Sequence, residues 1–128
     1  MPEQTCLIRL PWPPKELSAN SRQDRRGATD KRQKYKSDCA MMVHHHKATI
    51  APDALLRITF HPPDNRRRDL DNMLSSIKYG LDGMADAAGV DDYGWRFQIE
   101  RGQKVKGGCV LVEVVPSEVD IELRGYVM

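Results

Sequence analysis

Two groups of acidic side chains are candidates for chemistry, and one of them adjoins a run of arginines. The stretch "RRRDLDN" contains Arg66, Arg67, Arg68, Asp69 and Asp71, and the pair Asp91 and Asp92 follows further along the chain. Mg²⁺ prefers oxygen ligands and keeps several of its waters, so a few aspartates suffice to hold it. The pattern therefore favours a site for something both anionic and metal-seeking.

A phosphodiester fits that description. Its hydrolysis needs an activated water, charge stabilisation on the phosphate and help for the leaving oxygen, and one or two Mg²⁺ ions supply all three. Clustered carboxylates repel one another without metal. The arginines and the positive end of a helix would keep Asp69 and Asp71 ionised. We interpret the aspartates as metal ligands and the arginines, with the helix end, as phosphate ligands.

Spacing limits how Asp69 and Asp71 share such a site. Residues two apart in a helix point about 200° apart, so we expect Asp69 as the N-cap and Asp71 in the first turn. The alternative is an acidic helix start after a basic loop, a common surface pattern. Asp64 is interpreted as a turn residue, and Asp82 and Asp86 as solvated.

The charge of the chain is unevenly distributed. Net charge is +2, but residues 1–68 carry 14 Lys/Arg against 7 Asp/Glu, and residues 69–128 carry 6 against 11. The dense cations of residues 22–36 favour a polyanion through phosphate contacts and counterion release. A solvated loop and helix face is the alternative. The candidate DNA contacts here, beside the three arginines above, are Arg25, Arg26, Lys31, Arg32 and Lys34.

Hydrophobic periodicity predicts alternating strands and helices. Strands are expected at 5–12, 54–62, 96–105 and 109–115, with "KGG" joining the last two as a hairpin. A mobile loop is expected at 15–28. Helices are expected at about 31–48, after a capping box at Asp30 and Gln33, and at about 69–87, with Gly89 as C-cap. Apolar residues at helical spacing mark the inner stripe of each helix, namely Tyr35, Cys39, Met42 and Val43 in the first and Leu70, Met73, Leu74, Ile77 and Leu81 in the second. The order β-α-β-α-β-β predicts a single α+β domain over 1–128, a two-layer sandwich of a small mixed sheet with both helices on one face.

Composition excludes several classes. The 128 residues, 40% of them apolar, suit one modest core. No apolar run approaches the ~20 residues of a membrane span, and no signal-peptide pattern opens the chain, so we expect a soluble, cytoplasmic protein. Cys6, Cys39 and Cys109 are odd in number and far apart, which predicts reduced structural thiols.

Other chemistry-bearing residues have simpler explanations. His44, His45 and His46 fan around a helix axis and are expected to be solvated or partly packed. Trp12, among prolines, is interpreted as a packing feature at a strand end more than as a base-stacking platform. Tyr93 and Trp95 either pack beneath the acidic group or meet DNA.

Four motifs resemble, in the same order, the RusA family of Holliday junction resolvases: "LPWPP", "PDNRRRDLDN", "GVDD" and "KGG". The resemblance covers roughly residues 5–115. It implies a homodimeric endonuclease, dependent on Mg²⁺ or Mn²⁺, that cuts four-way DNA junctions by paired nicks in recombination and repair. It also implies a bacterial host cell and a phage or prophage origin. The family's catalytic aspartates carry over to Asp69, Asp71 and the Asp91-Asp92 pair, in which Asp92 is the better match.

One position departs from the family pattern. The family usually has a lysine four residues after the second aspartate, where this chain has Ser75. Lys78 is the nearest cation and lies on the same helix face as Asp71, so we expect it to reach a leaving oxygen or phosphate. The departure also supports an alternative, a branched-DNA binding module that cleaves weakly or not at all. A phosphate-binding structural protein explains the aspartates least well.

The distance between the two acidic groups bears on how a site is assembled. An unbroken helix over 71–87 would put its ends about 24 Å apart. One chain can then gather both groups only if the helix breaks, for which Gly80 and Gly83 are the weak points. The alternative, which we favour, is a site composed of two subunits in a two-fold dimer.

Overall fold

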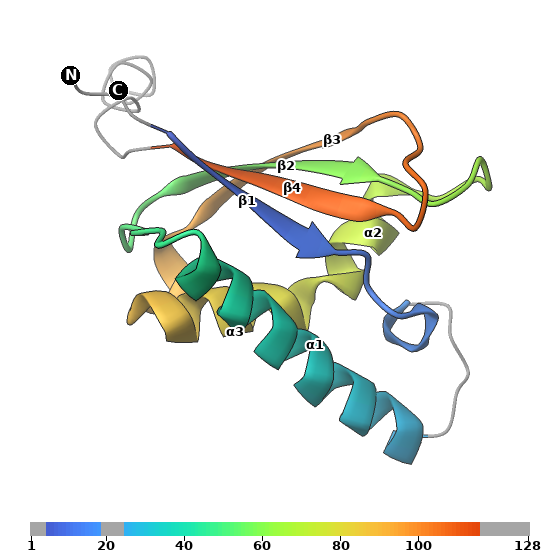
Figure 1. Ribbon diagram of the computed structural model, residues 1–128, viewed down its shortest axis with the longest axis horizontal. Helices are drawn as coiled ribbons and strands as arrows, with labels where there is room; N and C mark the ends of the chain where they lie inside the picture. Colours follow the sequence, from blue (N-terminus) through green and yellow to red (C-terminus); the bar gives the residue numbers. More distant parts are fainter. Residues whose placement is uncertain (1–4, 19–24, 116–128) are drawn as a thin grey trace.

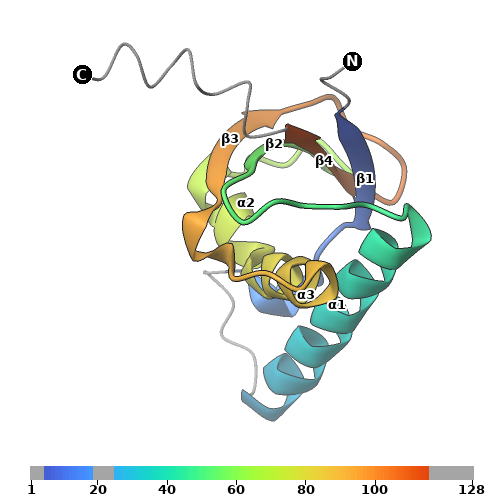
Figure 2. The same ribbon diagram turned by 90° about the vertical axis from the view of Figure 1, so that its left-hand side faces the viewer.

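The computed structural model describes residues 5–18 and 25–115. Along the chain the elements are β1 (Cys6–Pro11), η1 (Lys15–Leu17), α1 (Arg25–His45), β2 (Leu55–His61), α2 (Leu70–Ser76), α3 (Lys78–Ala88), η2 (Asp92–Gly94), β3 (Arg96–Arg101) and β4 (Cys109–Val115) (Figure 1). Figures 1 and 2 both show the helices on one face of the sheet. The expected two-layer α+β architecture is confirmed.

The sheet is mixed, as expected, with strand order β1-β4-β2-β3. The strand β4 runs antiparallel to both β1 and β2, while β3 runs parallel to β2. Alternate residues of β1, β2 and β4 face the helices and are fully buried, among them Ile8, Leu56, Ile58, Phe60 and Val112. This alternation is the period of two that predicted the strands.

The predicted hairpin of β3 and β4 is wrong. These strands lie on opposite sides of β2 and do not pair with each other. Their connection crosses the end of β2, where the Gly102 amide donates to the Phe60 carbonyl and the Val105 amide to the Pro62 carbonyl. A turn signal between two strands indicates that the chain reverses direction. It does not indicate which strands pair, because pairing depends on the order of all strands in the sheet.

The first helix begins earlier than predicted. It starts at Arg25, so part of the expected loop is helical, and Asp30 lies inside α1 and not at its N-cap. Its buried stripe is as expected, with Tyr35, Cys39 and Val43 inside the core. The Tyr35 hydroxyl donates to the Pro11 carbonyl over 2.8 Å, which ties α1 to the end of β1.

The second predicted helix is two helices, because the chain breaks at Ile77. The Ser76 hydroxyl donates to the Met73 carbonyl over 2.7 Å, the acceptor that the Ile77 amide would use in a continuous helix. That amide bonds instead to the Leu74 carbonyl at 3.2 Å. Serine bonding back to its own helix backbone is a recognised cause of bending. The side chain of Ile77 stays in the core, as its place in the predicted stripe required.

The glycines expected to break this helix have another role. A Cβ at Gly83 would fall on the backbone carbonyl of Lys36, and one at Gly80 would lie 2.6 Å from Cε2 of Tyr35. Both glycines therefore let α3 approach α1 closely. Gly89 is the C-cap of α3 in the left-handed conformation, φ 74°, as predicted.

The three cysteines are free thiols, two of them buried. Burial raises the pKa of Cys39 to about 12, which suits an unreactive structural thiol. In the described part of the chain, no helix is long and apolar enough to cross a membrane.

Candidate functional site

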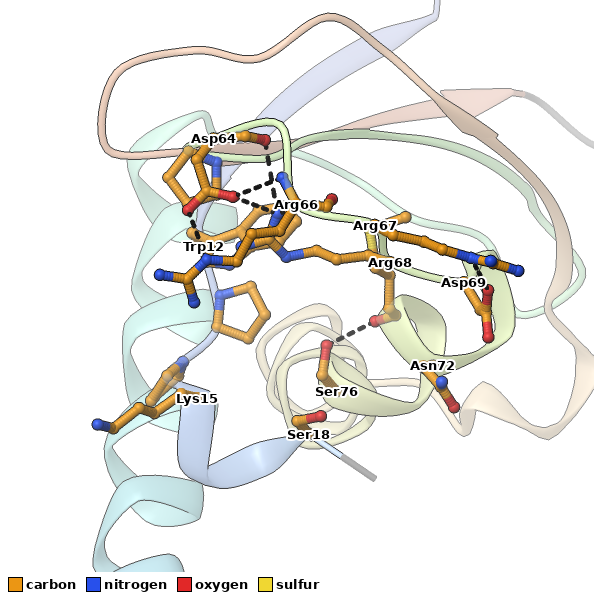
Figure 3. Close-up of a pocket in the computed structure, with 14 residues that line it drawn as sticks. Trp12, Lys15, Ser18, Asp64, Arg66, Arg67, Arg68, Asp69, Asn72 and Ser76 are labelled. Atoms are coloured by element: carbon orange, nitrogen blue, oxygen red, sulfur yellow. Dashed lines mark hydrogen bonds and ion pairs between the residues drawn. The ribbon is translucent and has the colours of Figure 1, made fainter. Parts of the chain in front are cut away.

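Two pockets adjoin the short helix α2. The first, which we call the basic pocket, has a volume of about 580 Å³ and is lined by Trp12, Lys15, Arg66, Arg67, Arg68, Asp69 and Asn72 among others (Figure 3). The second, the acidic pocket, has about 370 Å³ and is lined by Asp71, Ser75, Lys78, Asp82, Asp92 and Phe97 among others. Helix α2 contributes Asn72, Met73 and Ser76 to the first and Asp71, Leu74 and Ser75 to the second. It therefore divides the two.

The loop before α2 is held in shape by Asp64 and Arg68. The Arg66 amide donates to Oδ1 of Asp64 over 3.0 Å, and Nη1 of Arg68 donates to the same oxygen over 2.8 Å. These bonds lower the pKa of Asp64, chiefly through Arg68. Asp64 is thus a turn residue, as predicted, and it also anchors an arginine.

The three arginines are not equivalent. The side chain of Arg68 is only 22% exposed, and its guanidinium lies 5.5 Å from the centre of the Trp12 ring. The side chain of Arg67 is 94% exposed, with Asp69 at 4.0 Å as an ion-pair partner. Arg66 is also exposed, 3.7 Å from Asp64. Arg66 and Arg67 are therefore available to a phosphate, whereas Arg68 stabilises the loop.

Arg101 supports this loop and was missed in the sequence. Its Nη2 atom donates to the Arg68 carbonyl over 2.7 Å, immediately before Asp69. The end of β3 is thereby joined to the start of α2. No sequence signal pairs Arg101 with this loop, because the contact depends on β3 lying parallel beside β2.

The acidic pocket brings together side chains from α2, α3 and η2. Asp71 and Ser75 come from α2, Lys78 and Asp82 from α3, and Asp92 from η2. Four of these side chains follow one another at intervals of four, three and four residues, which is the spacing of one helical stripe. They are Asp71, Ser75, Lys78 and Asp82. The break at Ile77 leaves this stripe on one side.

Asp82 was predicted to be solvated, and the structure places it in the acidic pocket instead. It is half-buried. Burial raises its pKa, and Asp92, through a hydrogen bond and charge repulsion, raises it further, against the lowering effect of Lys36 and Lys78. The helical spacing from Asp71 was the signal that could have found it.

The four predicted metal-ligand aspartates are not gathered in one place. Asp71 and Asp92 line the acidic pocket, while Asp69, the N-cap of α2 as expected, lines the basic pocket. Oδ1 of Asp91 accepts from the Tyr93 amide over 2.9 Å and caps η2. Metal ligation by all four of these aspartates stays a prediction.

The unbroken helix on which the two-subunit site rested is wrong. With the chain bent at Ile77, Asp71 and Asp92 of one chain line the same pocket. The geometric need for a second subunit to complete the acidic group is therefore removed. The break lies at Ile77, directly after the serine pair, and not at Gly80 or Gly83.

The predicted DNA contacts on α1 are partly engaged within the protein. The Arg32 guanidinium lies 5.1 Å from the Tyr79 ring centre, and Nζ of Lys34 pairs with Asp38 at 2.9 Å. Lys31 is exposed. Arg25 and Arg26 begin α1, but their side chains lie outside the described residues. The assignment of these cations to DNA stays a prediction.

The remaining candidates behave as follows. Trp95 is buried and donates to the Ala51 carbonyl over 3.0 Å, so its side chain packs in the core. Tyr93 is 93% exposed. His44 and His45 are exposed and His46 is half-buried. Within residues 5–18 and 25–115, no three His, Cys, Asp or Glu side chains stand together as a ready-made metal site.

The chemistry of the acidic pocket nevertheless fits Mg²⁺. Its donors are carboxylate oxygens, and Mg²⁺ is usually bound through one or two carboxylates, with waters and substrate phosphates completing its coordination. Asp82 and Asp92 adjoin each other, and Asp71 lines the same pocket. The repulsion that raises the pKa of Asp82 is of the kind that a bound cation relieves.

Fold and site define a small α+β protein in which a cation-rich pocket adjoins a carboxylate pocket, the combination that metal-dependent cleavage of a nucleic-acid backbone requires. No protein-family model matches the chain. It is 36% identical over 117 residues to the crossover junction endodeoxyribonuclease RusA of Enterobacteria phage HK97, covering 85% of this chain and 92% of the phage protein. It is also 36% identical over 95 residues to an uncharacterized protein of Xylella fastidiosa, covering 70% of this chain and 62% of that protein. The chain belongs to the RusA family of crossover junction endodeoxyribonucleases.

Proposed function

We propose that this protein is a Mg²⁺-dependent endonuclease that resolves four-way DNA junctions by paired nicks. The observation that carries the proposal is the acidic pocket, where Asp71, Asp82 and Asp92 meet Lys78 beside an exposed arginine loop. The name of the phage HK97 relative, a crossover junction endodeoxyribonuclease, supports the choice of substrate. A role in recombination and repair, in the cytoplasm of a bacterial host, accompanies this activity.

The carboxylates of Asp71, Asp82 and Asp92 would hold the metal, with Mn²⁺ as an alternative to Mg²⁺. When bound, the ion supplies charge stabilisation at the phosphate and a water of lowered pKa. Lys78 lines the same pocket and would bring its ammonium group to the phosphate or the leaving oxygen. Arg66 and Arg67 would bind neighbouring phosphates of the strand.

Paired nicks on opposing strands need two equivalent sites, which a two-fold homodimer provides. Each site would lie within one chain, because Asp71 and Asp92 of one chain line the same pocket. The partner subunit would then supply the second nick and hold the junction symmetrically.

The second candidate is a branched-DNA binding module with weak or no cleavage. Ser75 is the observation that favours it, because the family's usual lysine is absent from that position. Ser75 and Lys78 line the same pocket, one helical turn apart. The pocket therefore keeps a cation, which favours the nuclease over the inactive module.

The test is a nicking assay on a synthetic four-way junction with Mg²⁺ or EDTA, with flap and linear duplex substrates as controls. We expect cleavage of the junction only with Mg²⁺. Asp71→Asn should abolish cleavage while junction binding stays intact or tightens, because it removes a metal ligand and a negative charge near phosphate. The matched control is Asp86→Asn, an exposed aspartate of α3 that pairs with Lys36 and should leave cleavage unchanged.

Two results would count against the nuclease. Junction binding without cleavage in Mg²⁺ and in Mn²⁺ would select the binding module. Loss of binding in parallel with cleavage in Asp71→Asn would show that Asp71 acts in folding or in DNA contact and not in the chemistry.

A further inference from the structure

The basic pocket contains more than phosphate ligands. Beside its cations it is lined by rings and apolar groups, namely Trp12, Pro13, Pro14, Pro63 and Met73. A surface that only follows a duplex backbone needs cations and hydrogen-bond donors. We propose that the basic pocket takes one nucleotide whose base has left the stack at the branch point, with Arg66, Arg67 and Lys15 at its phosphates and Trp12 and the prolines at its base.

The apolar wall is held in place by contacts within the protein. The Trp12 ring packs edge-on against Phe60 with ring centres 6.5 Å apart, and the Arg68 guanidinium lies over it. The backbone at Gly108 is so close that an added Cβ would lie 2.9 Å from Cγ of Trp12. Trp12 is thus a packing feature, as predicted, and its half-buried ring lines the pocket together with the Arg68 guanidinium, a second plane on which a base can stack. A wall fixed in advance loses little entropy on binding.

The size and the charge of the pocket agree with one nucleotide. Its volume of about 580 Å³ lies within the range of roughly 300–1,000 Å³ for pockets that take small ligands. Figure 3 shows the arginines on one side and Lys15 and Ser18 on the other. A phosphate at the rim would therefore meet Arg66 and Arg67 from the loop between β2 and α2, and Lys15 from η1. A flat base could enter between these two groups of cations.

An extruded base explains the pocket better than an intact duplex does. A duplex presents its phosphates outward and turns its bases inward, so the ring-lined interior would stay empty. Stacking is interrupted where the arms of a branched DNA meet, and a base there is extruded at lower cost than a base stacked on both sides within a duplex. This inference rests on the proposed function for its DNA substrate, but it concerns the pocket across α2 from the acidic one.

The test uses the full chain in EDTA, so that no cleavage contributes. Trp95→Phe leaves Trp12 as the sole tryptophan, and its fluorescence is followed during titration with a single strand of four thymidines at several salt concentrations. Base stacking on an aromatic ring is worth about 1–3 kcal/mol. We expect quenching of Trp12, and a loss of affinity of roughly 5- to 150-fold, with unchanged salt dependence, when the inner thymidines are replaced by abasic units.

The charged contacts have a different signature. Arg67→Ala should reduce the slope of log affinity against log salt by about 0.7, the value for one phosphate contact on a single strand. Arg67 is almost fully exposed, so this variant tests the pocket without disturbing the fold. The control is Lys47→Ala, an exposed lysine just after α1, which should leave the slope unchanged.

The outcomes separate this inference from the nuclease proposal. Junction cleavage without quenching of Trp12, or equal affinity for thymidine and abasic strands, would overturn the nucleotide pocket and leave the nuclease in place. Suppose instead that Trp12 is quenched and the abasic strand binds more weakly, but the protein does not cut junctions. That result would support the nucleotide pocket and contradict the nuclease proposal. An unchanged salt slope in Arg67→Ala would remove the arginine from the pocket's phosphate contacts and overturn the inference in its stated form.

Discussion

Gly83 of α3 is a sharp test of how this fold holds its site. A Cβ at this position would fall on the backbone carbonyl of Lys36 in α1. A carbonyl within a helix cannot turn aside as a side chain can, so Gly83→Ala must move one helix. Because Asp82 precedes Gly83 and Lys78 begins the same helix, the movement also displaces one wall of the acidic pocket.

The expected destabilisation follows from two opposing terms. Overpacking a core costs about 1–3 kcal/mol, and a backbone obstacle places this site near the upper end, at about 3 kcal/mol. Replacing glycine by alanine in a helix interior returns about 1 kcal/mol. The net loss is about 2 kcal/mol in the free energy of unfolding, or about 8 °C in Tm for a domain of this size.

Urea denaturation followed by circular dichroism measures the loss directly, and the nicking assay measures its effect on the site. Asp86→Ala is the matched control, because it also introduces alanine into α3 but removes only an exposed ion pair with Lys36 at 3.2 Å. Such a pair is worth about 0.2–1 kcal/mol, which the gain in helix propensity nearly offsets. A Gly83→Ala protein as stable as the wild type would refute the close approach of the two helices.

Two further predictions concern the acidic pocket. The pKa of Asp82 is raised in the folded state, so folding favours its protonated form, and its contribution to stability falls as pH rises above the unfolded pKa near 3.8. Asp82→Asn should therefore raise Tm in EDTA at neutral pH and flatten the pH dependence of Tm, while reducing the Tm gain on adding Mg²⁺. A lower Tm in EDTA would contradict the repulsion. Mixing inactive Asp71→Asn chains with inactive Asp92→Asn chains should restore no nicking, because every chain still carries a substitution in its own acidic pocket. Restored nicking of one strand would support a site shared between subunits.

Local patterns predicted the strands and the buried faces of the helices well. Alternation located β1, β2 and β4, and the stripe of Tyr35, Cys39 and Val43 is buried as its spacing required. These features depend on neighbours within a few residues of one another. The pairing of β3 with β2 depends on which strands share the sheet, and a turn signal carries no information on that. The hairpin prediction failed for this reason.

The candidate site shows the same division between local and non-local information. The acidic and basic motifs were visible as sequence, and the N-cap position of Asp69 followed from spacing alone. The place of Asp82 and the contact of Arg101 with the loop before α2 depend on how separate elements pack. The distinction between Arg67 and Arg68 likewise required the structure, because only the fold puts Arg68 over Trp12.

The break at Ile77 connects these observations. In a continuous helix the stripe of Asp71, Lys78 and Asp82 would run straight, and its far end would carry the following turn away from Asp71. The Ser76 hydroxyl bonds back to the Met73 carbonyl, a contact that favours bending. The helix ends after two turns, and α3 begins after Ile77 as a separate helix that packs against α1. The chain that follows α3 then brings Asp92 to the pocket that Asp71 lines. The interruption of the helix at Ile77 thus accompanies the gathering, within one chain, of carboxylates that the sequence separates by a whole helix.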